Sequence, residues 1–129
     1  MKEKFLIIEI IMMVMIVIVA IIHKDWFAAN KPVGFWFHIG WAIPFSAFIA
    51  VVFFVTHNYL LTAALILQRF DFFNPILNLL RKEYLFYLGS ATMTEAWLDR
   101  LLEIYNNSYP YIWAAGCLAF TYLEIKLFV

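Results

Sequence analysis

An apolar run close to the amino terminus, residues 5–22, reads FLIIEIIMMVMIVIVAII and is interrupted only by Glu9. Crossing the hydrocarbon core of a bilayer takes about 20 apolar residues in a helix. Lys2 and Lys4 precede the run, as in a secretory signal. The run is nevertheless longer than the apolar core of such a signal, about 7 to 15 residues, and no small-residue cleavage site follows it. We therefore expect residues 5–22 to form a retained transmembrane helix.

The composition extends this expectation to the whole chain. Of its 129 residues, 66% are hydrophobic, 20% aromatic and 14% charged, whereas an ordinary soluble domain has about 25% charged residues. This excludes a sizeable separate soluble domain and predicts a single membrane domain over residues 1–129. Nine basic residues balance nine acidic ones, so the charge does not favour nucleic acid. The single cysteine, Cys117, excludes an internal disulfide.

A second apolar run extends from Phe35 to Leu67. As one straight helix it would be about 50 Å long, which is too long for one upright span. We expect a span over residues 35–57, and two continuations stay open. Either one long helix is tilted and projects past the membrane, or the helix breaks near Thr56, His57 and Asn58 and continues along the interface.

Residues 69–108 do not read as membrane-spanning, and two short helices are expected there. Asn74 and Pro75 resemble an N-cap and a first helical residue, which predicts an amphipathic helix over residues 75–88. A capping box at Thr92 predicts a second one over residues 92–105. A turn over residues 106–110 and a last span over residues 111–129 complete the fold. The predicted class is an all-α integral membrane protein with three transmembrane helices and two amphipathic, interfacial helices between the second and third spans.

Positively charged flanks set the expected orientation, because Lys and Arg are retained on the cytoplasmic side. With three spans and the N-terminus inside, six basic residues lie inside and three outside. The inner set is Lys2, Lys4, Arg69, Arg81, Lys82 and Arg100, and the outer set is Lys24, Lys31 and Lys126. The count predicts an N-terminus inside and a C-terminus outside.

Ionisable groups within the spans are the first candidates for function, because they are costly in lipid. Depth along the helices matches Glu9 with His57 in the inner half of the membrane, and Glu124 with His38 in the outer half. Each pair could belong to a proton path or a cofactor site. The simpler interpretation, which we favour, is that each pair locks helices together, because interhelical polar contacts are usual in membranes.

Histidines also raise the question of a haem, which needs two axial imidazoles at one depth. His38 and His57 lie about 28 Å apart along one helix and cannot share an iron. His23, beside Lys24 and Asp25, is expected at a wet interface. A haem or quinone would therefore use His38 or His57 together with a group from another chain, and the cofactor is unknown.

Two further patterns predict contacts between helices. Ala42, Ser46 and Ala50 recur at four-residue spacing, which allows close approach of another helix. In the helix predicted over residues 92–105, one face is apolar and is expected to dock on a partner protein. The docking residues are Trp97, Leu98, Leu101 and Leu102.

No catalytic motif is present, so we expect no active site of the chain's own. The sequence favours a non-catalytic accessory or anchoring subunit of a larger membrane complex, such as a respiratory or other oxidoreductase assembly, with other membrane subunits and the bilayer as partners. One alternative is a haem- or quinone-binding anchor that uses His38 or His57. Another is a small transporter or channel component, against which the low glycine content, 4 of 129, and the lack of paired broken helices weigh.

Overall fold

The computed structural model describes residues 2–29, 35–83, 85 and 96–129. This part of the chain forms four helices: α1 (Lys2–Ala28), α2 (Phe35–Thr56), α3 (Tyr59–Leu80) and α4 (Ala96–Phe128). α1, α3 and the Glu103–Phe128 part of α4 are each long and apolar enough to cross a membrane by length and composition. The expected all-helical class is therefore confirmed, but the helices are arranged differently from the prediction.

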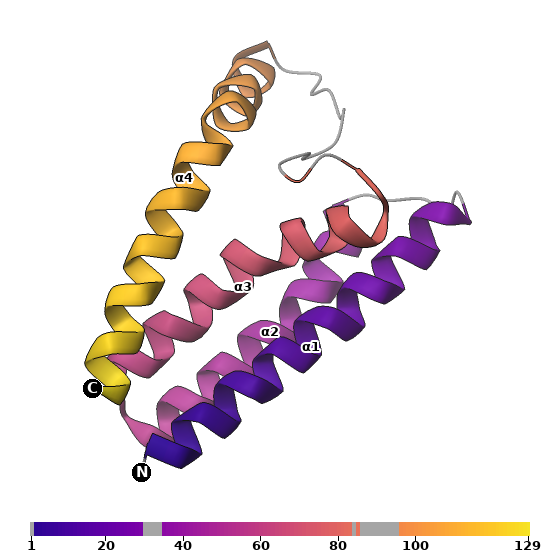
Figure 1. The fold of residues 1–129 in the computed structure, drawn as a ribbon. Helices are drawn as coiled ribbons and strands as arrows, with labels where there is room; N and C mark the ends of the chain where they lie inside the picture. Colours follow the sequence, from indigo (N-terminus) through magenta and orange to yellow (C-terminus); the bar gives the residue numbers. More distant parts are fainter. Residues whose placement is uncertain (1, 30–34, 84, 86–95) are drawn as a thin grey trace.

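Successive helices run in opposite directions, so both chain ends lie at the same end of the molecule (Figure 1). The Lys2 ammonium donates a hydrogen bond to the main-chain oxygen of Phe128, 3.2 Å away. The sequence instead predicts termini on opposite sides of a membrane, and the sides that they face stay a prediction. That prediction rests on an odd number of crossings, whereas four antiparallel helices return the chain to the end at which it began.

The helix predicted over residues 5–22 is confirmed, and α1 extends beyond it at both ends. Its buried side chains recur every three or four residues, which places them on one face of the helix. They are Phe5, Glu9, Met12, Ile16, Val19, Ala20 and His23. This face packs against α3, whereas α1 and α2 touch only slightly.

The second apolar run breaks at His57 and Asn58, as one of the two alternatives anticipated. His57 has a φ of 52°, a left-handed conformation that ends α2. The Asn58 side chain then accepts a hydrogen bond from the main-chain N–H of Leu61 at 2.9 Å and caps α3. The chain reverses there, and α3 packs back against α2 (Figure 1).

The helix predicted over residues 75–88 is wrong, because Pro75 lies inside α3 and not at a helix start. α3 ends at Leu80, where the N–H of Arg81 bonds the carbonyl oxygen of Leu77. Lys82 follows with a φ of 57°. Residues 84 and 86–88 lie outside the described part of the chain.

The helix predicted over residues 92–105 and the turn predicted over residues 106–110 are also wrong as separate elements. From Ala96 the chain is one 33-residue helix that passes through Pro110 and contains the predicted last span. Proline is tolerated inside such helices where neighbouring groups satisfy the freed backbone. Residues 92–95 lie outside the described part.

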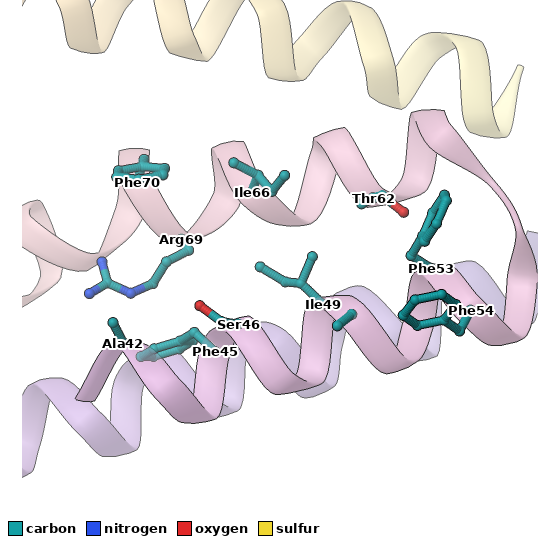
Figure 2. A pocket seen from close by; sticks show the side chains of 11 residues that line it. Ala42, Phe45, Ser46, Ile49, Phe53, Phe54, Thr62, Ile66, Arg69 and Phe70 are labelled. Carbon is teal, nitrogen blue, oxygen red and sulfur yellow. The ribbon is translucent and has the colours of Figure 1, made fainter. Parts of the chain in front are cut away.

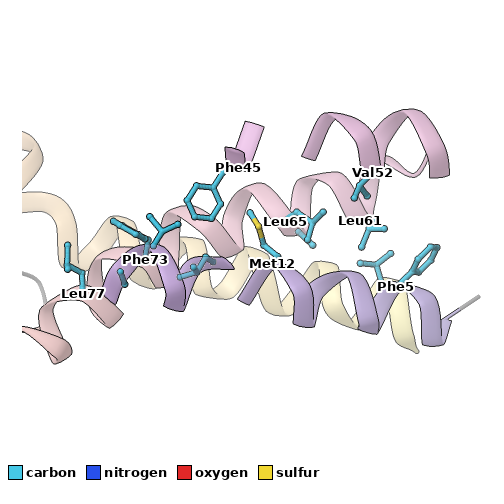
Figure 3. Packing of buried hydrophobic residues seen from close by; sticks show 13 residues of the cluster. Phe5, Met12, Phe45, Val52, Leu61, Leu65, Phe73 and Leu77 are labelled. Carbon is cyan, nitrogen blue, oxygen red and sulfur yellow. The ribbon is translucent and has the colours of Figure 1, made fainter. Parts of the chain in front are cut away.

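The core forms around α3, which packs against all three other helices. Met12 and Ile16 of α1 meet Leu61, Ala64 and Leu65 of α3, and all five are fully buried. Phe45 and Val52 of α2 close this layer from the other side (Figure 3). α3 is therefore the central helix, and its polar residues lie inside the bundle.

Candidate functional site

Polar side chains are concentrated on α3, although it is apolar enough to span a membrane. Gln68, Asp71 and Asn78 are buried, and Arg69, which follows Gln68 in the sequence, is partly buried. Gln68, Asp71 and Asn78 recur at helical spacing and therefore share one face of α3. Arg69 lies on another side, toward α2. Residues 69–108 do not read as membrane-spanning in the sequence, so these residues could not be recognised there as a group.

The first polar group joins three helices through Glu9, Gln68 and Glu124. The amide nitrogen of Gln68 donates to the main-chain oxygen of Glu9 at 3.0 Å, and the Glu9 and Glu124 side chains lie within hydrogen-bonding reach of each other. Among the described residues, Oε1 of Glu9, Oε1 of Glu124 and Oε1 of Gln68 are buried without a hydrogen-bond partner. Such atoms are costly inside a protein, so this cluster is a candidate site for a proton, a water molecule or a polar contact.

This arrangement differs from the expected pairs. Glu9 meets Glu124 and not His57, which is exposed in the turn between α2 and α3 with its ring against Phe53. Glu124 and His38 cannot pair, because Glu124 lies near the end of α4 and His38 near the start of α2, at opposite ends of the bundle (Figure 1). The side chain of His38 lies outside the described residues. The pairing of Glu124 with His38 assumed that α2 and α4 meet at a common depth.

The second polar group holds α4 against α3. Pro75 has no N–H, so the carbonyl oxygen of Asp71 loses its usual partner four residues along the helix. The indole N–H of Trp113 donates to that oxygen at 3.0 Å. One turn further along α4, a Cβ atom at Gly116 would overlap the Asp71 carboxylate, so a larger residue there would require the carboxylate to move. These contacts set the register of α4.

His23 lies in an aromatic box and not at the wet interface that its neighbours suggested. It is only 4% exposed, and its Nδ1 lies 2.9 Å from the main-chain oxygen of Val19. The rings of Phe27, Trp41 and Phe73 surround it at centroid distances of 5.9, 5.6 and 5.1 Å. The charged neighbours Lys24 and Asp25 do not indicate this packing in the sequence, because Trp41 and Phe73 come from other helices.

A groove of about 550 Å³ lies between α2 and α3. Figure 2 shows Arg69 reaching across it from α3 toward Ala42 and Phe45 of α2. The Arg69 guanidinium carbon lies 4.6 Å from the ring centroid of Phe45 and 4.0 Å from that of Phe73. The remaining lining is mostly apolar and aromatic, which is typical of small-molecule sites.

The small residues Ala42, Ser46 and Ala50 line this groove and are exposed. Their regular spacing predicted a contact with another helix. Within the described part of the chain they form the floor of the groove. Their small side chains leave space for a neighbouring group, as the spacing predicts. No described helix fills that space in the structure.

Of the four predicted docking residues, the structure describes one side chain. Leu101 is 54% exposed on α4. The side chains of Trp97, Leu98 and Leu102 lie outside the described residues, although their backbone belongs to α4. Their docking role stays a prediction.

A comparison of the chain with models of protein families, with curated proteins and with solved structures found no match.

Proposed function

We propose that this chain is an integral membrane protein that crosses the bilayer four times and serves as a non-catalytic accessory or anchoring subunit of a membrane complex. α2 is the fourth crossing. It has 22 residues, as α3 has, and only two residues join them. A helix of that length measures about 33 Å, against roughly 30 Å for the hydrocarbon core.

Four crossings change the expected orientation. The end that carries both termini has three basic residues, Lys2, Lys4 and Lys126. The opposite end has four among the described residues, namely Lys24, Arg81, Lys82 and Arg100. Because basic residues are retained on the cytoplasmic side, this count favours termini outside the cytoplasm.

The observation that carries the subunit proposal is the length of α4. The contact between Trp113 and Asp71 fixes the register of α4 on α3. Leu80 lies nine residues beyond Asp71, so α4 reaches its level near Ile104. The first eight residues of α4 then project about 12 Å beyond α3. Leu101 on this projection and Ile104 at its base are 54% and 55% exposed. Outside the hydrocarbon core, such apolar side chains are stabilised when a partner covers them.

A protein partner explains this surface better than a lipid headgroup layer. The projection carries Asp99 and Glu103 against Arg100 in the sequence, and the cytoplasmic leaflet is anionic. An acidic helix is repelled by that surface, whereas protein interfaces combine apolar and charged groups. A respiratory or other oxidoreductase assembly is the partner expected from the sequence.

Co-purification tests the proposal. A tagged chain with Leu101→Ser and Ile104→Ser should recover its partner chains several-fold less well, while its amount in the membrane fraction stays the same. Asn107→Ser, an exposed polar position on the same helix, is the matched control and should have no effect. Mass identification of the recovered chains tests the class of complex. Normal recovery of every partner by the double variant would contradict the docking role of α4.

A further inference from the structure

The groove between α2 and α3 combines a long apolar surface with one cation. Phe53 and Phe54 lie at one end of it and Ala42 and Arg69 near the other (Figure 2). From Ala42 to Phe53 the α2 helix rises about 16 Å. The volume of the groove, about 550 Å³, lies within the range of ligand pockets, roughly 300 to 1,000 Å³. The shape suits a flexible chain better than a compact ring.

Arg69 supplies the charge at one end of this surface. Among the described residues it contacts the rings of Phe45 and Phe73, and no carboxylate lies within ion-pair distance of it. Asp71, its nearest acid in sequence, faces Gly116 on α4. Arginine keeps its charge in proteins, and a charge in the membrane is stabilised by a counter-ion. The groove therefore has a place for an anion.

The depth of Arg69 narrows the choice of anion. It is the eleventh of the 22 residues of α3, about 15 Å from either end. A phospholipid would have to bring its phosphate, glycerol and both esters to that depth. A fatty acid has only one small polar group, and its planar carboxylate matches the fork of the guanidinium.

We propose that the groove binds a fatty acid, with the carboxylate on the Arg69 guanidinium and the acyl chain over Ala42, Ser46 and Ala50 toward Phe53. The aromatic faces of Phe45 and Phe73 hold the guanidinium in place for this contact. Binding here does not depend on the subunit role of α4, because none of the described side chains of α4 lines the groove.

The test compares oleic acid with oleyl alcohol, which has the same chain without the charge. Affinities are measured on the purified, delipidated full chain in nanodiscs of uncharged lipid. Oleic acid should bind about tenfold or more tightly than oleyl alcohol, because ionic hydrogen bonds are the stronger ones. Arg69→Gln should remove that preference and leave binding of the alcohol unchanged. Arg81→Gln is the matched control, since Arg81 also lies over a ring, that of Phe27, but does not line the groove.

A second pair of variants tests the path of the acyl chain. Ala50→Phe fills the groove floor and should weaken both ligands, whereas Val51→Phe, at an exposed neighbouring position outside the lining, should weaken neither. If Arg69→Gln does not fold, Arg69→Lys is measured in its place. A lysine keeps the charge but lacks the planar fork, so the preference for oleic acid should decrease without being lost. Equal affinity of wild type and Arg69→Gln for oleic acid would overturn the proposal. Tighter binding of phosphatidic acid or lysophosphatidic acid than of oleic acid would overturn it in favour of a phosphate headgroup.

Discussion

Trp113 donates its indole N–H to the main-chain oxygen of Asp71, the acceptor that Pro75 leaves without its helical partner. A proline that would ordinarily weaken α3 thus provides the acceptor that attaches α4. The contact joins residues 42 positions apart and sets the height of α4 against the rest of the bundle.

This relationship predicts an energetic coupling between Trp113 and Pro75. Trp113→Phe should destabilise the chain by about 1 to 3 kcal/mol, because it leaves a buried carbonyl oxygen without a donor. In a Pro75→Ala background, the new N–H of residue 75 can bond that oxygen, so Trp113→Phe should cost about 1 kcal/mol less. Unfolding in mixed micelles, followed by circular dichroism, gives the four free energies of the cycle. Equal costs in both backgrounds would contradict the exchange of donors.

Gly116 provides a second test of the α3 and α4 contact. Gly116→Ala should destabilise the chain by about 1 to 3 kcal/mol, because the added methyl overlaps the Asp71 carboxylate. Gly40→Ala is the matched control, since nothing lies within 4 Å of a Cβ there, and it should be neutral or mildly stabilising. Adding Asp71→Ala should recover part of the loss. If both glycine variants unfold at the same temperature, α4 does not approach α3 this closely.

The meeting of Glu9 with Glu124 predicts that these carboxyl groups depend on each other. A carboxyl group donates a hydrogen bond only when it carries its proton, and a glutamine amide donates without one. Glu9→Gln should therefore preserve the contact and Glu9→Ala should remove it. A double-mutant cycle with Glu9→Ala and Glu124→Ala should give a coupling of at least about 0.5 kcal/mol. The same cycle with His57→Ala in place of Glu124→Ala is the control and should give none, whereas coupling only to His57 would restore the pairing expected from the sequence.

Cysteine labelling tests the four-crossing arrangement. In a Cys117→Ala background, Lys4→Cys and Lys126→Cys should react with a membrane-impermeant reagent from the same face, and Arg81→Cys from the opposite one. Three crossings place Lys4 with Arg81 and apart from Lys126. The labelling pattern in sealed vesicles of known orientation therefore separates the two counts, and it also shows which face is cytoplasmic.

Local patterns in the sequence were sufficient to predict a helix over residues 5–22 and to indicate the break that ends α2 as one of two alternatives. Residues 5–22 are apolar without a competing signal, and Thr56, His57 and Asn58 are three polar residues within one apolar run. Asn58 then acts as the N-cap that its residue type favours. Features of this kind depend on neighbours within a few residues, so they can be seen in the sequence.

The errors concern α3 and α4, where distant contacts override local preference. The sequence predicts a helix start at Pro75, because proline is common at that position, but Trp113 compensates for the missing hydrogen bond of Pro75 inside α3. Gln68 lowers the local hydropathy, yet its amide bonds the main chain of α1. The groove that contains Arg69 could not be predicted from the sequence for the same reason. It exists only when α2 and α3 pack against each other.

The central position of α3 has a consequence for how the chain is made. α1 and α2 contact each other little, so the first two helices to leave the ribosome have almost no shared core until the third arrives. α3 is far less apolar than α1 and carries Gln68, Arg69 and Asp71, which enter lipid reluctantly on their own. Only two residues join α3 to α2, so α3 follows α2 directly during synthesis and forms the second helix of a hairpin with it. Lengthening that link should slow insertion of α3 even where the finished bundle is unchanged.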